Sequence, residues 1–199
     1  RLKERDCYLV MNRQCALALT ISDNRYMGMD SISLIDLWEG WQVTRSPMRL
    51  MPLGGTGLPQ SSLRGSCARA GRGYGLLFQH EGEGRTLHAH MDRFRDGQAL
   101  DAQILLTQEP EESIVMCTPF EKPGQFYFNQ KINCMRAQGK VTLGDREYVF
   151  DPEDSFAVLD WGRGVWTCRG TWYWGSASGM VDGVPFGFNI GYGFGDTSA

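Results

Sequence analysis

Residues 159–179, LDWGRGVWTCRGTWYWGSASG, combine one aspartate with an unusual density of large aromatic rings. They contain four of the chain's six tryptophans: Trp161, Trp166, Trp172 and Trp174. A carboxylate such as Asp160 that lies among indoles is partly removed from water, which favours its protonated form. Asp160 is therefore a candidate general acid near neutral pH. The same carboxylate could instead pair with Arg163 or Arg169, and the sequence leaves both possibilities open.

The tryptophans allow two interpretations. If the chain turns at residues 162–164 between two antiparallel strands, Trp166, Trp172 and Trp174 share one face. Indoles on one face can fill the interior of a β-barrel, because tryptophan buries a large area. Rings around a few polar groups also form small-molecule pockets. The sequence alone does not separate a core from a pocket.

Other catalytic motifs are not evident. His88 and His90 point to the same face of a strand, as two metal ligands would, but we identify no third ligand and expect a metal-free pair. The GGTG segment at 54–57 lacks the G-K-[ST] ending of a phosphate-binding loop. The GSASG segment at 175–179 lacks the strand-to-helix setting of a nucleophilic serine. We expect no cofactor and no metal.

Composition argues against two classes of partner. The formal charge of −3 and the scattered basic residues give no general attraction to nucleic acid. No stretch approaches the roughly 18 apolar residues of a membrane-spanning segment, so we expect no integral membrane segment. The six cysteines include no C-x-x-C pair. This favours reduced, mostly buried thiols and a cytoplasmic location.

The elements that must position these residues have the pattern of an all-β protein. Apolar and polar residues alternate with a period of two over most of the chain, and turn dipeptides separate the runs. No stretch sustains the apolar spacing of a long amphipathic helix. Glycine makes up 25 of 199 residues, nearly double the usual share of about 7%. Such an excess suits bulges and curved sheets that close into barrels.

The pattern is interrupted at residues 121–125, EKPGQ, because Pro123-Gly124 breaks any strand. We therefore expect a linker there, between a first β-domain over residues 1–120 and the start of a second over residues 126–199. The chain opens with Arg1 rather than methionine and ends directly after a strand-like run. We expect a piece of a longer protein, with segments missing at both ends.

Four blocks resemble the bacterial family catalogued as domain of unknown function 2804, whose members extend beyond both ends of this chain. The blocks are YFNQKINCM (127–135), FDPEDSFAVLDWGRGVW (150–166), TWYWGSASG (171–179) and PFGFNIGYGFGDTSA (185–199), and the likeness continues upstream through YLVMNRQCALALTISDN (8–24). The family has no established activity. One departure is Cys168, which stands where the family usually has tyrosine, so any role of that position is open here.

The order of elements is also similar, more remotely, to the tandem lipocalin-like group of carotenoid hydratases, AttH-like proteins and certain fungal pericyclases. The matching elements are Tyr127 with Lys131, the hairpin at 136–149 and residues 159–162. This resemblance implies antiparallel lipocalin-like barrels in tandem, the second incomplete, around an apolar cavity. It implies Asp160 as proton donor. The ligand would then contact Tyr127, Lys131, Trp161, Arg163, Trp166, Trp172 and Trp174.

Three functional hypotheses follow. The first is a lipocalin-like protein that binds an apolar or amphipathic small molecule, favoured because no second catalytic group is evident. The second is a cofactor-independent hydratase, lyase or isomerase that acts through Asp160 on a lipid- or terpenoid-like substrate. The third is a structural β-protein whose tryptophans only fill the core. A ring-lined cavity would support the first two, and an arginine partner for Asp160 would count against catalysis.

Overall fold

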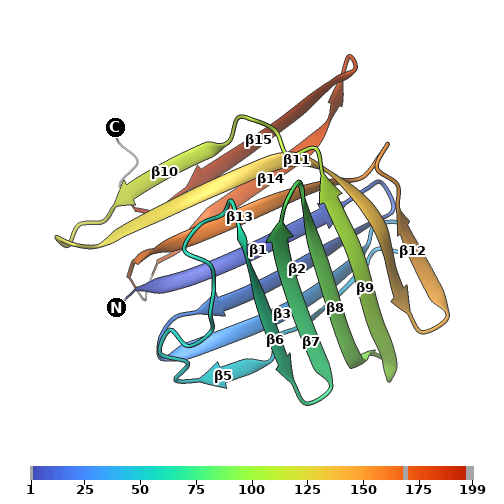
Figure 1. The fold of residues 1–199 in the computed structure, drawn as a ribbon, viewed down its shortest axis with the longest axis horizontal. Helices are drawn as coiled ribbons and strands as arrows, with labels where there is room; N and C mark the ends of the chain where they lie inside the picture. The colour runs from blue at the N-terminus through green and yellow to red at the C-terminus, as the bar shows by residue number, and fades with distance from the viewer. Residues whose placement is uncertain (1, 168–169, 196–199) are drawn as a thin grey trace.

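The computed structural model describes residues 2–167 and 170–195 (Figure 1). This part of the chain forms antiparallel strands and turns, without a helix, which confirms the all-β expectation. It accordingly holds no helix able to cross a membrane. The strands are β1 (Lys3–Met11), β2 (Cys15–Asp23), β3 (Met27–Asp36), β4 (Trp41–Arg45), β5 (Met48–Leu50), β6 (Gly65–Gly71), β7 (Tyr74–Glu81), β8 (Gly84–Arg95), β9 (Gln98–Thr107), β10 (Ile114–Pro119), β11 (Phe126–Leu143), β12 (Arg146–Phe150), β13 (Phe156–Val165), β14 (Tyr173–Val181) and β15 (Val184–Tyr192).

The alternation in the sequence corresponds to burial in the strands. In β9, Leu100, Ala102, Ile104 and Leu106 are buried, while the residues between them are exposed. Successive side chains of a strand point to opposite faces, so every second residue reaches the interior. β13 differs, because nine of its ten residues are buried. A strand buried on both faces must be covered on each side by another layer.

Thirteen of these strands form one sheet, in the order β4-β3-β2-β1-β13-β11-β9-β8-β7-β6, with β5, β10 and β12 paired beside this path. The long strand β11 connects the two halves. Its first half pairs with β10 and β13, and its second half pairs with β9 and β12. β14 and β15 form a separate two-stranded sheet.

The large sheet folds over itself, so that β6–β9 lie across β1–β3 (Figure 1). The hydrophobic core fills the space between these layers; for example, the ring centroids of Tyr8 from β1 and Phe78 from β7 are 5.0 Å apart. The end strands β4 and β6 do not pair with each other, so the described sheet is not closed into a barrel.

Strands from both sides of the expected linker share this sheet, since β1 pairs with β13 and β9 pairs with β11. Residues 121–125 themselves form the turn between β10 and β11. The division of the chain into two domains stays a prediction.

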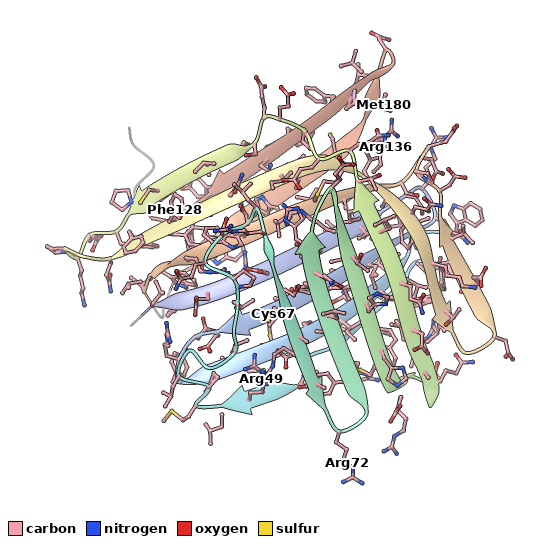
Figure 2. The ribbon with its side chains drawn as sticks, in the orientation of Figure 1. Arg49, Cys67, Arg72, Phe128, Arg136 and Met180 are labelled. Atoms are coloured by element: carbon pink, nitrogen blue, oxygen red, sulfur yellow. The ribbon has the colours of Figure 1, made fainter. Side chains whose placement is uncertain are left out.

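The five cysteines within the described residues are free thiols. Three of them, Cys15, Cys67 and Cys134, are buried. Figure 2 shows Cys67 among the strands of the front layer, where burial raises the pKa of its thiol to about 11. Such a thiol is protonated at neutral pH and therefore unreactive.

Candidate functional site

A row of polar side chains crosses three neighbouring strands near the middle of the sheet. Asp160 of β13 lies opposite Cys7 of β1 on one side and Lys131 of β11 on the other. Directly paired residues project to the same face of a sheet. Lys131 Nζ donates to Asp160 Oδ1 at 2.5 Å, and Arg5 pairs with Oδ2. The Tyr127 hydroxyl also donates to Oδ1, at 3.4 Å, so three side chains share one carboxylate.

The Asp160 carboxylate is 1% exposed, and its charge influences the groups around it. Burial lowers the pKa of Arg5, but attraction to Asp160 outweighs burial, so this pKa lies above its ordinary value. Burial and then the charge of Asp160 raise the pKa of Tyr127. Burial also raises the pKa of the Cys7 thiol. At neutral pH the phenol and the thiol are uncharged, so the charge of the row resides in Arg5, Lys131 and Asp160.

Two glycines of β13 leave room for β11. A Cβ on Gly162 would lie 2.5 Å from the hydroxyl oxygen of Tyr127, and a Cβ on Gly164 would lie 2.2 Å from the carbonyl oxygen of Phe126. Glycine in a strand interior often marks such a close approach. The expected turn at residues 162–164 is therefore wrong. β13 continues through them without a break, because these glycines accommodate a neighbouring strand instead of bending the chain.

The β14–β15 hairpin lies along β11 (Figure 1). Residues of the hairpin and of the polar row line one cavity on the face away from the core. Arg136 of β11 and Met180 of β14 are neighbours at one end of this contact (Figure 2), with Arg136 Nη2 3.1 Å from the sulfur. β13 is thus buried on both faces because the core covers one and the hairpin the other.

A bulge in β11 at residues 132–135 holds the hairpin in place. Cys134 has a φ of 61° there, and the ladder with β13 skips two residues. Asn133 is one of the skipped residues, so its side chain can turn to the hairpin. Its Nδ2 donates to the carbonyl oxygen of Ala177 at 2.9 Å, and Asn189 Nδ2 donates to its Oδ1 at 2.6 Å.

A cavity of about 280 Å³ lies between the polar row and the hairpin. Its floor consists of the polar residues Arg5, Tyr127, Asn129, Lys131 and Asp160, and Asn189 adds a polar group from the hairpin. Its wall is mainly aromatic and apolar: Ile114, Met116, Trp166, Trp172, Tyr173, Trp174, Tyr192 and Phe194. Small-molecule sites have this composition, an apolar wall with a few placed polar groups.

The rings of the wall contact one another and the cations of the floor. The ring of Phe194 meets those of Tyr127 and Trp172 edge-on, at centroid distances of 4.7 Å and 5.7 Å. Lys131 Nζ lies 4.7 Å from the ring centroid of Trp174, within cation–π range. The hairpin is therefore linked to the floor by ring contacts as well as by hydrogen bonds.

The cavity brings together six of the eight residues expected from the sequence: Tyr127, Lys131, Asp160, Trp166, Trp172 and Trp174. Trp161 and Arg163 lie on the opposite face of β13. Arg163 Nη1 donates to Asp6 Oδ1 at 2.8 Å, and the guanidinium carbon lies 4.4 Å from the Trp161 ring centroid. The cations that pair with Asp160 are Arg5 and Lys131. Cys168 and Arg169 lie outside the described residues.

Over residues 1–199 the sequence matches the model of a family described as Domain of unknown function (DUF2804). The chain belongs to this family. No curated protein matches the DUF2804 chain.

Among solved structures, the DUF2804 chain is similar to a Nitrosomonas europaea protein provisionally named AttH, with a TM-score of 0.55 and 10% identity. The similarity covers 94% of this chain and 63% of the other, so the chain spans less than two thirds of that protein's length. At this identity the likeness concerns the fold. The resemblance to the family that was inferred from the sequence is confirmed, and the resemblance to AttH-like proteins is confirmed for the fold.

The sequence-based prediction lacks Arg5, Asn129 and Asn189 of the polar lining. Asn129 lies midway between Tyr127 and Lys131 in β11, so the period of two places all three on one face and could have identified it. Asn129 is 1% exposed, and its Oδ1 has no hydrogen-bond partner among the described residues. Arg5 is 155 positions from Asp160, and no local pattern connects the two.

His90 makes polar contacts at both ring nitrogens. Nδ1 lies 2.7 Å from Asp101 Oδ1, and Nε2 lies 2.7 Å from Asp92 Oδ1. Asp92 is two residues after His90 and thus on its face, a signal that the sequence analysis overlooked. Hydrogen bonds to Asp92 and Asp101 raise the pKa of His90. Residues 2–167 and 170–195 contain no group of three His, Cys, Asp or Glu side chains suited to a metal ion.

Proposed function

We propose that the protein binds an apolar or amphipathic small molecule in the cavity between β11, β13 and the β14–β15 hairpin. The observation that carries this proposal is the cavity of about 280 Å³, with an aromatic wall and a buried polar floor. This volume is close to the lower end of the range for small-molecule sites, about 300–1,000 Å³.

The positions of the tryptophans favour a pocket over a filled core. Of the four tryptophans in residues 159–179, Trp161 belongs to the buried hydrophobic core. Trp166 and Trp174 are half-buried and Trp172 is 42% exposed, and all three line the cavity. Rings that only filled a core would be fully packed. Rings beside an open volume are available to a ligand.

The proposal includes a lipocalin-like relationship. An antiparallel sheet that curves around an apolar site is common to such binding proteins, and the similar AttH fold supports the comparison. A tandem arrangement, with a second barrel completed by residues beyond this chain, is part of the same proposal.

We favour binding without turnover over the hydratase, lyase or isomerase hypothesis. Asp160 faces the cavity, as a proton donor would. However, it accepts hydrogen bonds from Arg5, Lys131 and Tyr127, and two of these donors are cations. A carboxylate in this setting holds its partners in place and is stabilised as an acceptor.

A cavity-filling variant tests the proposal. Gly191 lines the cavity, and a Cβ there would meet its nearest neighbour at 3.9 Å, so Gly191→Phe can place a ring inside it. Gly175 is on the same hairpin outside the cavity lining, and a Cβ there meets nothing within 4 Å. Gly175→Phe is therefore the matched control.

The measurement is tryptophan fluorescence during titration with dodecanoic acid, 1-dodecanol, retinol and retinoic acid. We expect a saturable change with at least one compound, retained in Gly175→Phe and lost in Gly191→Phe. The absence of any response, or equal responses in both variants, would refute the proposal. Product analysis by mass spectrometry, with Asp160→Asn beside the wild type, separates binding from catalysis.

A further inference from the structure

The charged residues that line the cavity do not balance. Arg5 and Lys131 contribute two positive charges, and Asp160 contributes one negative charge. Tyr127, which also lines it, is uncharged at neutral pH. The floor therefore has an excess of one positive charge. Lys131 and Asp160 are largely removed from water, with side chains 9% and 1% exposed, while the side chain of Arg5 is 29% exposed. A charge removed from water is stabilised when a second group compensates it.

The floor also has more donors than its acceptor can use. A lysine ammonium has three N–H groups and an arginine guanidinium has five. Asp160 takes one N–H of Lys131 and pairs with Nη2 of Arg5. No other carboxylate lines the cavity within the described residues. Further N–H groups of both cations are thus suited to an acceptor that the ligand brings.

Asn129 provides an independent indication of a ligand group. Its side chain lies between Tyr127 and Lys131 on the cavity face of β11 and is 1% exposed, yet its Oδ1 has no partner among the described residues. Buried polar atoms are normally paired. A carboxamide can turn to present either its oxygen or its NH₂ group, so Asn129 can donate to a ligand anion.

We propose that the cavity selects amphipathic molecules with a carboxylate head group, which Arg5, Lys131 and Asn129 bind at the floor. The apolar part of the ligand then lies against the aromatic wall. This inference rests on the proposed binding function and adds the chemistry of the head group. A carboxylate accepts several hydrogen bonds at once and neutralises the excess charge. An alcohol supplies no charge, and an apolar ligand satisfies none of these donors.

The experiment compares dodecanoate with 1-dodecanol, two ligands with the same chain and different heads, by calorimetric or fluorescence titration at pH 8. We expect dodecanoate to bind at least about tenfold more tightly, because hydrogen bonds to charged groups exceed neutral ones by about this factor. Added salt should weaken dodecanoate and leave dodecanol nearly unchanged.

Asn129→Asp places a negative charge at the floor with almost no change in volume. We expect it to lower the affinity for dodecanoate about tenfold or more relative to the affinity for dodecanol. Asn129→Leu removes the donor without adding charge and should weaken dodecanoate less. If Asn129→Asp does not fold, as judged by circular dichroism, Asn129→Leu and the salt series carry the test.

The outcomes separate the two proposals. Failure of the wild type to bind any of dodecanoate, dodecanol, retinol and retinoic acid would overturn the binding function; if only the retinoids bind, retinoic acid and retinol serve as the matched pair. Binding of dodecanol as tightly as dodecanoate, or unchanged dodecanoate affinity in both folded Asn129 variants, would overturn the carboxylate selectivity and leave the binding function intact.

Discussion

The ring of Tyr127 occupies the space that a side chain on Gly162 would need. A Cβ on Gly162 would lie 2.5 Å from the tyrosine hydroxyl oxygen and 2.6 Å from Cε2. Tyr127 in turn donates to Asp160 and meets the ring of Phe194. The absence of a side chain at Gly162 therefore allows Tyr127 to contact both Asp160 in the floor and Phe194 in the wall.

Gly162→Ala should destabilise the protein by about 1–3 kcal/mol, because a methyl group forces the Tyr127 ring aside. Gly164→Ala should cost more, since its Cβ would meet the backbone carbonyl of Phe126, which cannot rotate away. Urea denaturation measures both losses. In a Tyr127→Leu background the cost of Gly162→Ala should fall. An unchanged cost there would show that the tyrosine is not the obstacle.

Removal of the Asp160 carboxylate alone should be more harmful than its removal together with the Lys131 ammonium. Asp160→Leu leaves buried Lys131 without its counter-ion, a change that typically costs about 3–5 kcal/mol. Combining it with Lys131→Met removes both buried charges, while Arg5, with its side chain 29% exposed, can turn to water. A double-mutant cycle from chemical denaturation should give a double variant more stable than Asp160→Leu. Additive losses would contradict this assignment of a buried ion pair.

His90 should make the stability of the β8–β9 region depend on pH. Its pKa is raised in the folded protein by hydrogen bonds to Asp92 and Asp101. The stabilisation is thus fully present below the unfolded value of about 6.5 and is lost as the pH rises through the folded value. The side chain is 44% exposed, so the effect should not exceed about 1 kcal/mol.

The measurement is the difference in unfolding free energy between wild type and His90→Gln, at pH 5.5 and at pH 9. We expect the wild-type advantage at the lower pH only. In the control variant Asp92→Asn/Asp101→Asn, the imidazole should titrate at a lower pH by nuclear magnetic resonance. A titration unaffected by the loss of both carboxylates would exclude them as the cause.

The strands could be predicted because their signal is local. Alternation in residues such as 99–107 reports which face is buried, and a dipeptide such as Gly144-Asp145 marks the turn between β11 and β12. Gly162 and Gly164 led to the wrong prediction of a turn, because glycine occurs both in turns and where two strands approach closely. Only the neighbouring strand distinguishes the two uses, and the neighbour is not adjacent in sequence.

The candidate site could be predicted only in part, because some of its residues come together from strands distant in sequence. Asp160 was found from its place among the tryptophans, and Tyr127 and Lys131 through a resemblance in the order of elements. Asn129 could have been found from the alternation of Tyr127 and Lys131 in β11. Arg5 joins the site because β1 pairs with β13, a contact between strands far apart in the sequence. Trp161 and Arg163 were grouped with Asp160 by proximity in sequence, but neighbouring strand residues include both faces.

The cavity has two sides, the floor and the β14–β15 hairpin attached through Asn133. The two sides should tolerate substitutions to different degrees. The floor belongs to strands that also form the core, so substitutions there affect folding. The hairpin forms its own small sheet within the described residues, so its inward residues can change with less effect on the remainder. If the cavity binds a ligand as proposed, substitutions in the hairpin should therefore change ligand preference with less loss of stability than substitutions in the floor. A mutant library that tests the proposed ligand binding should concentrate on residues 172–174 and 189–194.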